Sequence, residues 1–150
     1  MKKINPIHIL LLVLLSALVG CGDDSSNIPE EEEHSRLIAG TWVLGENSQV
    51  LRDGNDITLD YQDFSIFFTE QFGYYAEGDP NNIIYPQGTW QYVDGNFGQI
   101  VLNEDERPIA VALAQDNTVL TITFTNDTNE PLGARSKGIT GSYTFILSKE

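Results

Sequence analysis

The stretch Leu120-Thr121-Ile122-Thr123-Phe124-Thr125 decides the fold, because apolar and polar residues alternate strictly along it. Successive side chains of a β-strand point to opposite faces, so the apolar residues share one face and the threonines share the other. Thr, Ile and Phe also pack well on a pleated surface. The pattern therefore predicts a strand with one buried face.

The same alternation recurs along the chain, between turn-forming stretches such as Asp53-Gly54-Asn55-Asp56 and Asp94-Gly95-Asn96. Short connections favour an antiparallel up-and-down meander, and closing the meander into a barrel removes its two edges. We therefore expect an all-β fold, an eight-stranded antiparallel up-and-down barrel, with a two-sheet β-sandwich as the alternative. The eight strands are predicted near residues 36–46, 57–69, 72–78, 87–94, 97–103, 107–115, 117–126 and 140–149.

One of these segments fits two kinds of structure. Pro108 to Gln115 reads PIAVALAQ and follows three acidic residues, an order that also begins helices. As a strand, the segment puts Ile109, Val111 and Leu113 on one face and alanines on the other. We prefer the strand, because the run is short and a turn follows it.

The N-terminus has the organisation of an export signal. Met1-Lys2-Lys3 is positively charged, residues 7–19 are apolar, and Leu18-Val19-Gly20-Cys21 has the order of a lipobox. The apolar run is shorter than the roughly 20 residues that a membrane span needs. The segment resembles the acceptor site of bacterial lipoproteins, which implies a signal peptide over residues 1–20 and lipid attachment to Cys21.

This resemblance gives an expected location and domain organisation. Residues 21–35 are expected to form an acidic, flexible tether, because Gly22 to His34 holds six acids and one apolar residue. Residues 36–150 are expected to form the barrel domain. Asp23 and Asp24 resemble surface-export signals of Bacteroidetes lipoproteins, so we expect the protein in the cell envelope, anchored to the outer membrane on either its periplasmic or its cell-surface face.

The charge of the mature chain excludes some partners. Without Lys2 and Lys3, six basic residues face 22 acidic ones, which leaves a formal charge of −16. Nucleic acids and anionic lipid surfaces attract basic patches, so we expect no nucleic-acid partner and a membrane contact only through the lipid on Cys21.

A short motif recurs where strands are predicted to begin. Gly40-Thr41-Trp42 returns as Gly88-Thr89-Trp90 and, more weakly, as Gly141-Ser142-Tyr143. In the context of an eight-stranded meander, the chain from about residue 36 to 149 resembles the lipocalin-like domains of small bacterial lipoproteins, especially those of Bacteroidetes. The resemblance implies a barrel with Trp42 at its closed end. Lipocalins usually set a basic residue of the last strand against this tryptophan, and Ser142 to Ser148 contains none.

The residues needed for most catalytic chemistry are few. His34 is the single histidine of the mature chain and Cys21 its single cysteine, and both precede the predicted barrel. A zinc site of His and Cys ligands and a Ser-His-Asp triad are therefore not expected there. We expect no enzyme activity, no cofactor and no metal.

Aromatic residues on the inward faces, together with Tyr75 at the expected open mouth, are the remaining candidates for a site. The residues that we expect to line a ligand site are Trp42, Phe68, Tyr75, Trp90 and Tyr92. An eight-stranded barrel is wide enough either to hold one small ligand or to be filled by its own side chains. Two functions follow: a carrier of a small hydrophobic or amphipathic molecule, or a filled barrel that serves as an interaction or inhibitor module for an envelope protein.

Overall fold

The computed structural model describes residues 29–103, 107–114, 116–127 and 140–150, so the predicted signal peptide, Cys21 and the tether up to residue 28 lie outside it. The elements are helix α2 (Glu30–Ile38), strands β1 (Gly40–Val43), β2 (Gln49–Arg52) and β3 (Asn55–Asp56), the 3-10 helix η2 (Thr58–Tyr61), and strands β4 (Ser65–Phe68), β5 (Gly73–Glu77), β6 (Gln87–Val93), β7 (Asn96–Leu102), β8 (Ile109–Leu113), β9 (Val119–Asn126) and β10 (Gly141–Lys149).

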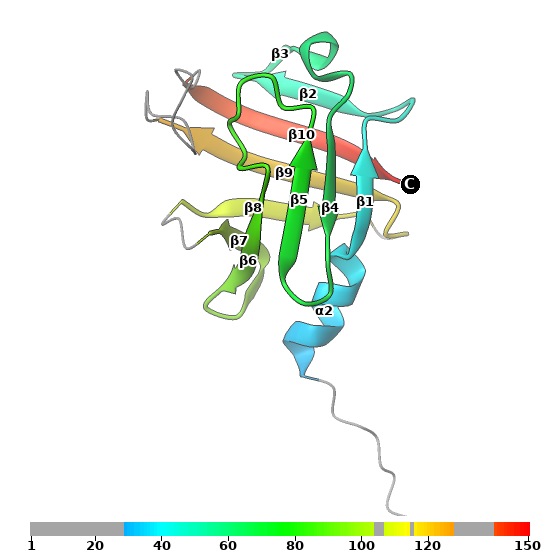
Figure 1. Cartoon of the computed structure of the whole chain (residues 1–150), viewed down its shortest axis with the longest axis vertical. Helices are drawn as coiled ribbons and strands as arrows, with labels where there is room; N and C mark the ends of the chain where they lie inside the picture. The colour runs from blue at the N-terminus through cyan, green and yellow to red at the C-terminus, as the bar shows by residue number, and fades with distance from the viewer. Residues whose placement is uncertain (1–28, 104–106, 115, 128–139) are drawn as a thin grey trace, which may run out of the picture.

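Eight of the strands close into a barrel. From β4 to β10 each strand pairs antiparallel with the next, and β4 pairs with β1. The circle closes between β1 and β10, where Trp42 lies opposite Lys149 and Val43 lies opposite Ser148. In Figure 1, β9 and β10 cross behind β1, β4 and β5. The predicted eight-stranded up-and-down barrel is confirmed, and the closure decides against the two-sheet sandwich.

The prediction of one strand over residues 57–69 is wrong for its first half, where the chain forms the 3-10 helix η2. Asp56 accepts hydrogen bonds from the backbone nitrogen of Thr58 at 2.9 Å and from its hydroxyl at 2.6 Å. Such a local side-chain turn competes with strand pairing and starts the 3-10 helix η2. The hairpin of β2 and β3, which we did not predict, lies before it and pairs with β10 beside β1.

The N-terminal end of the domain also differs from the prediction. The helix α2 covers residues that we assigned to the flexible tether, up to residue 35, and the start of the predicted first strand. Four glutamates in its first turn interact favourably with the positive end of the helix dipole. Ser35 and Ile38 are buried against the barrel, and this packing orders a segment whose composition alone predicts disorder.

The segment with two possible structures is a strand. In β8, Ile109 and Val111 are buried while Ala110 and Ala112 are exposed, which is the alternation expected for a strand with one face in the core. The helix alternative is therefore wrong.

Trp42 lies at the end of the barrel that α2 covers. Its ring is fully buried, and its indole nitrogen donates a hydrogen bond of 2.8 Å to the carbonyl oxygen of Ile38. The Nζ atom of Lys149 lies 5.1 Å from the ring centroid. Lys149 is the last residue of β10 and follows Ser148 directly, so the final strand does set a basic residue against Trp42, just beyond the range Ser142 to Ser148 that contains none.

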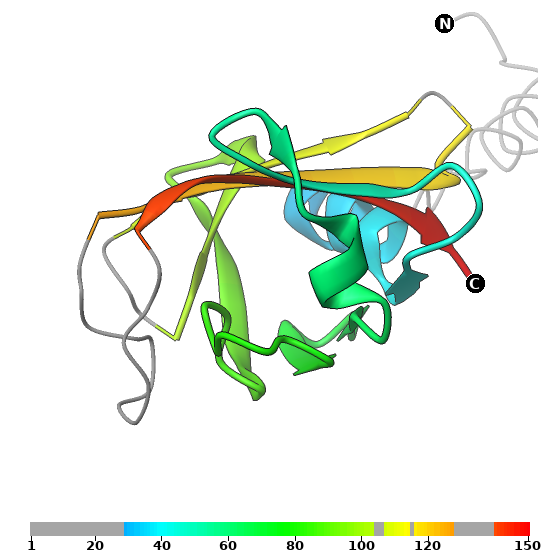
Figure 2. The same ribbon diagram turned by 90° about the horizontal axis from the view of Figure 1, so that it is seen from above.

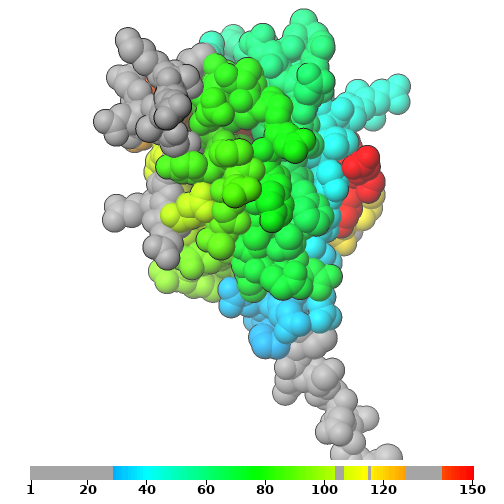
Figure 3. Space-filling model, viewed as in Figure 1, coloured from blue at the N-terminus to red at the C-terminus, as the bar shows by residue number. Residues whose placement is uncertain are grey.

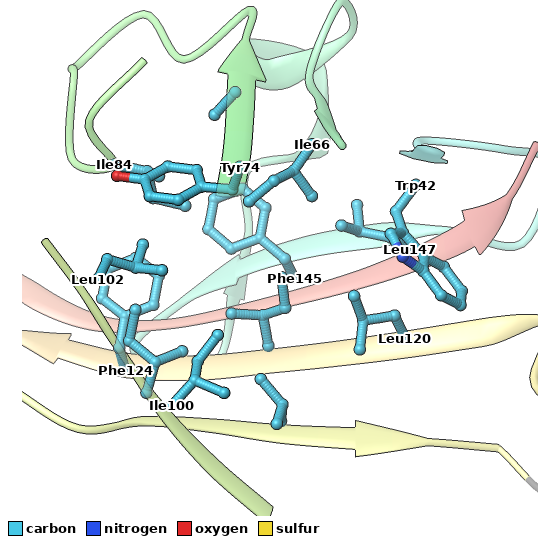
Figure 4. Close-up of a cluster of buried hydrophobic side chains, with 14 of the residues drawn as sticks. Trp42, Ile66, Tyr74, Ile84, Ile100, Leu102, Leu120, Phe124, Phe145 and Leu147 are labelled. Carbon is cyan, nitrogen blue, oxygen red and sulfur yellow. The ribbon is translucent and has the colours of Figure 1, made fainter. Parts of the chain in front are cut away.

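The core fills the barrel with aromatic and aliphatic side chains. Figure 4 shows side chains from strands far apart in the chain converging there, among them Trp42, Tyr74, Phe124 and Phe145. The helix α2 lies against one end of the barrel, and the segment between β5 and β6 lies at the opposite end (Figures 1 and 2).

Gly78 is required by close backbone packing. It has a φ of +69°, and a Cβ atom there would overlap the backbone carbonyl of Asp63. We expect Gly78→Ala to lower the free energy of unfolding by about 2–5 kcal/mol, through left-handed strain and overpacking. Gly54→Ala is the matched control, because Gly54 has a φ of +78° with nothing within 4 Å; it should cost about 1–2 kcal/mol. Urea unfolding measures both, and equal losses would contradict the packing argument.

Candidate functional site

The structure places four of the five predicted ligand-site residues in the core. Trp42, Phe68 and Trp90 are almost completely buried, and Tyr92 is 8% exposed. Phe68 and Trp90 pack edge to face at 5.7 Å, and Trp90 and Tyr92 at 5.2 Å. Tyr75 is 54% exposed, so it is not brought together with the others.

The mouth opposite α2 is closed by the segment between β5 and β6. Asp79 holds this segment in place: its carboxylate accepts hydrogen bonds from the backbone nitrogens of Asn81 at 3.0 Å and Ile84 at 2.8 Å. Ile83 and Ile84 are thereby inserted into the core, where both are buried. The place where a lumenal ligand would enter is occupied by the protein's own side chains.

The hollow beside this mouth is small. It lies where residues 83–85 meet β7, β8 and β9, and it offers only about 20 Å³. One water molecule needs about 10–15 Å³ on this measure, whereas ligand sites usually measure about 300–1,000 Å³. The space has room for a water molecule and none for a carried ligand.

A larger hollow lies at the end of the barrel that α2 covers, between α2 and strands β6, β7 and β8. We call it the helix groove, and its volume is about 330 Å³, at the lower end of the range for small-ligand sites. It is lined by His34, Leu37 and Ile38 of α2 and by Tyr92, Phe97, Gly98, Val111, Ala112, Leu113 and Asn117.

An irregularity in β7 shapes this groove. Tyr92 pairs with Ile100, but the next residue, Val93, pairs with Asn96, so residues 97–99 have no partner in the register with β6. The Asn96 side chain stabilises the bulge by accepting a hydrogen bond from the backbone nitrogen of Gly98 at 3.0 Å. Bulges often redirect side chains beside binding sites. Here the bulge brings Phe97 against α2.

Three aromatic rings form one wall of the helix groove. His34 stacks on Phe97 with ring centroids 4.0 Å apart and planes within 6° of parallel. Tyr92 meets Phe97 edge to face at 4.9 Å. These contacts join α2 to β6 and β7, and they offer a flat apolar surface to a ring-shaped ligand.

The hydroxyl of Tyr92 is buried and has no hydrogen-bond partner among the described residues. An unpaired hydroxyl of this kind costs about 1–3 kcal/mol. Burial, and secondarily the negative charge of Glu31, raises the pKa of Tyr92 to about 12, so the hydroxyl keeps its proton at neutral pH.

Two other surface hollows are larger, at about 360 and 400 Å³, but polar and acidic residues form most of their lining. Phe67 and Tyr75 form a stacked pair across β4 and β5, with ring centroids 6.4 Å apart and exposed fractions of 40% and 54%. The strands that carry this pair form the front face of the molecule in Figure 3. Within the described ranges, no three His, Cys, Asp or Glu side chains are grouped so that they could hold a metal ion.

Sequence reasoning missed most of the helix groove. His34 was assigned to the tether, and Phe97 is an apolar residue of a kind common in strands, so nothing marked it as part of a site. Gly98 by itself does not indicate a bulge. The Asn96-Phe97-Gly98 order, in which an asparagine precedes a glycine by two residues, is the one local signal for the turn that Asn96 stabilises.

The architecture defines the class of protein: a closed, eight-stranded, up-and-down β-barrel, consistent with a lipocalin-like barrel. The chain matches no family model, and no curated protein or solved structure is detectably similar to it. No helix in the described part of the chain has the length and apolar character required to cross a membrane.

The carboxyl of Asp79 gives a pH-dependence for the closed mouth. Burial raises the pKa of Asp79 above its ordinary value of 3.8, against the opposing effect of its backbone hydrogen bonds. A raised pKa means that the fold favours the protonated form. The contribution of Asp79 to stability is therefore fully present below pH 3.8 and declines as the pH rises through the pKa in the folded protein.

We expect the free energy of unfolding of the wild type, relative to that of Asp79→Asn, to fall as the pH rises from 3.8 through the pKa of Asp79 in the folded protein. Above that pKa the difference should stay level. Urea unfolding at a series of pH values measures the difference. Two curves that remain parallel through the interval would contradict the effect of burial.

Proposed function

We propose that this protein is a lipid-anchored lipoprotein of the cell envelope that binds a small, mostly apolar molecule in the helix groove rather than at the opposite mouth of the barrel. The observation that carries the proposal is the contrast in volume. The hollow at the barrel mouth measures about 20 Å³, whereas the helix groove measures about 330 Å³ and is lined mainly by apolar and aromatic side chains.

The lipobox supports the anchoring part of the proposal, and the length of the tether limits the distance from the membrane. Pro29 lies eight residues after Cys21, and an extended chain spans at most about 3.6 Å per residue. The start of α2 would then lie within about 29 Å of the bilayer surface. The tether would enter the domain at the α2 end of the barrel, where the helix groove lies.

A second candidate function is that of a protein-interaction or inhibitor module. The stacked pair of Phe67 and Tyr75 favours it, because exposed aromatic residues are common at the centres of interfaces. The pair is small and isolated, so the helix groove supports the first candidate better.

The anchor makes a direct prediction. We expect the wild-type chain, expressed in a bacterial host, to be labelled by a clickable fatty acid and recovered with the membranes. Cys21→Ser should abolish both the label and the membrane recovery, because Cys21 is the single thiol of the chain. Labelling of the Cys21→Ser protein would contradict lipid attachment at this residue.

A second prediction concerns ligand binding in the helix groove. Gly98 lines it, its φ is outside the left-handed region, and a Cβ there would meet only the end of the Asn96 side chain at 3.3 Å and the Val111 carbonyl at 4.0 Å. Gly98→Val should therefore fold and narrow the groove. We expect it to weaken binding of the neutral dye N-phenylnaphthylamine to residues 22–150, which contain every described element, by roughly tenfold, about 1.4 kcal/mol.

Ala110→Val is the matched control, because Ala110 is exposed on β8 and does not line the groove. Fluorescence titration gives the dissociation constants, and thermal unfolding checks that both variants are folded. Equal binding by the two variants, or none by the wild type, would exclude the helix groove as the site.

A further inference from the structure

The exposed aromatic pair of the barrel wall lies in a part of the chain without positive charge. Between Arg52 and Arg107 the sequence holds eleven acidic residues and no lysine or arginine. This stretch forms β3, η2 and the strands from β4 to β7. In Figure 1, β4 and β5 lie at the front of the barrel, and Figure 3 shows the same face in space-filling form. The charged side chains of this stretch are all negative, so it attracts a cationic partner over a distance.

The pair itself selects the same charge. Phe67 and Tyr75 stand directly opposite each other on β4 and β5, with exposed fractions of 40% and 54%. Their ring planes lie within 23° of parallel, and the centroids are 6.4 Å apart. The faces of aromatic rings carry negative potential and bind ammonium and guanidinium groups. The guanidinium of arginine is flat and stacks on such rings, so arginine fits the pair better than lysine does.

Glu77 places a carboxylate beside the rings. It follows Tyr75 by two residues on β5, so its side chain is on the same outer face, about 6.8 Å further along the strand. Glu77 is exposed, and it forms no ion pair within the described part of the chain. The carboxylate is therefore free to bind a cationic side chain next to the one on the rings.

Other partners fit this surface less well. In a two-fold contact between two copies of the chain, the same patch would meet itself, so the acids of both copies would repel each other. Anionic polymers are repelled for the same reason. Two exposed rings also offer too little area for a broad protein interface, which leaves a short, extended segment.

We propose that the outer face of β4 and β5 binds an extended, arginine-rich segment of a partner protein. One arginine stacks on Phe67 and Tyr75, and the arginine two residues along pairs with Glu77. Alternate side chains of an extended segment lie about 6.8 Å apart on one face, which matches the spacing of Tyr75 and Glu77. This inference rests on the second candidate function, the interaction module, and is independent of the helix groove, which neither ring lines.

A labelled octapeptide of alternating glycine and arginine tests the inference on residues 22–150 by fluorescence anisotropy. Tyr75→Thr should weaken its binding by roughly twofold to fivefold, the range for an exposed cation–π contact. Glu77→Gln should weaken it by up to about fivefold, as for an exposed ion pair, and less at high salt. The same peptide with citrulline in place of arginine keeps the shape without the charge, and it should lose most of the binding.

Two matched controls remove the same groups elsewhere. Leu59→Thr removes an apolar side chain that is 81% exposed on η2, and Glu46→Gln removes an exposed carboxylate in the turn between β1 and β2. Both should leave peptide binding nearly unchanged. Thermal unfolding checks that all four variants are folded.

NMR spectroscopy of the wild type locates the bound peptide without any substitution. We expect the arginine peptide to shift the amide signals of Phe67, Tyr75 and Glu77. The signals of Thr121 and Thr123 should stay in place, because β9 crosses behind β4 and β5 (Figure 1).

The outcomes are distinguishable. If Tyr75→Thr and Glu77→Gln weaken binding no more than their controls do, the attraction is diffuse and this surface is overturned. Peptide shifts confined to other strands would also overturn the surface, while an interaction role would stand. Equal binding of the citrulline peptide, or binding of the neutral sugar maltohexaose at the rings without the arginine peptide, would overturn the cationic partner. If no peptide binds, the interaction module fails as well. Binding of N-phenylnaphthylamine in the helix groove should be the same in all four variants, so each of these failures leaves the first candidate function standing.

Discussion

The hydrogen bond from the indole nitrogen of Trp42 to the carbonyl of Ile38 joins helix α2 to the first strand of the barrel. A fully buried indole N–H needs an acceptor, and the last carbonyls of a helix need donors, so each group satisfies the other. The bond fixes α2 across the end of the barrel. Held in this position, α2 closes that end of the barrel and forms one wall of the helix groove. It is also the element through which the predicted lipid anchor would connect to the domain.

Both ends of the barrel are closed by segments of the chain itself. Ile38 is buried at one end, and Ile83 and Ile84 are buried at the other, where Asp79 holds their segment. An eight-stranded barrel has an interior that side chains can just fill, and here aromatic rings fill it. The helix groove arises where this packing stops, because the bulge in β7 separates Phe97 from the regular ladder.

The alternation of apolar and polar residues was sufficient to predict the barrel, because strand faces depend on neighbours two positions apart. It could not show whether the interior is hollow, since that depends on two segments, α2 and residues 78–86, whose burial comes from distant contacts. The glutamate run of α2 is typical of disorder, and only Ser35 and Ile38 of the helix are buried. Trp42, Phe68 and Trp90 were correctly expected to face inward. An inward orientation alone does not distinguish a core residue from one that lines a ligand site. Tyr92 alone of the predicted set borders the helix groove.

Methyl NMR spectroscopy of residues 22–150 during titration with N-phenylnaphthylamine tests the central claim most directly, because methyl groups line both candidate spaces. The account predicts that the dye shifts the methyl signals of Leu37, Val111 and Leu113, which line the helix groove. The signals of Ile83, Ile84 and Leu102, which line the hollow at the mouth, should stay in place. Shifts confined to the second group would show that the barrel opens and binds in its lumen, which contradicts the account.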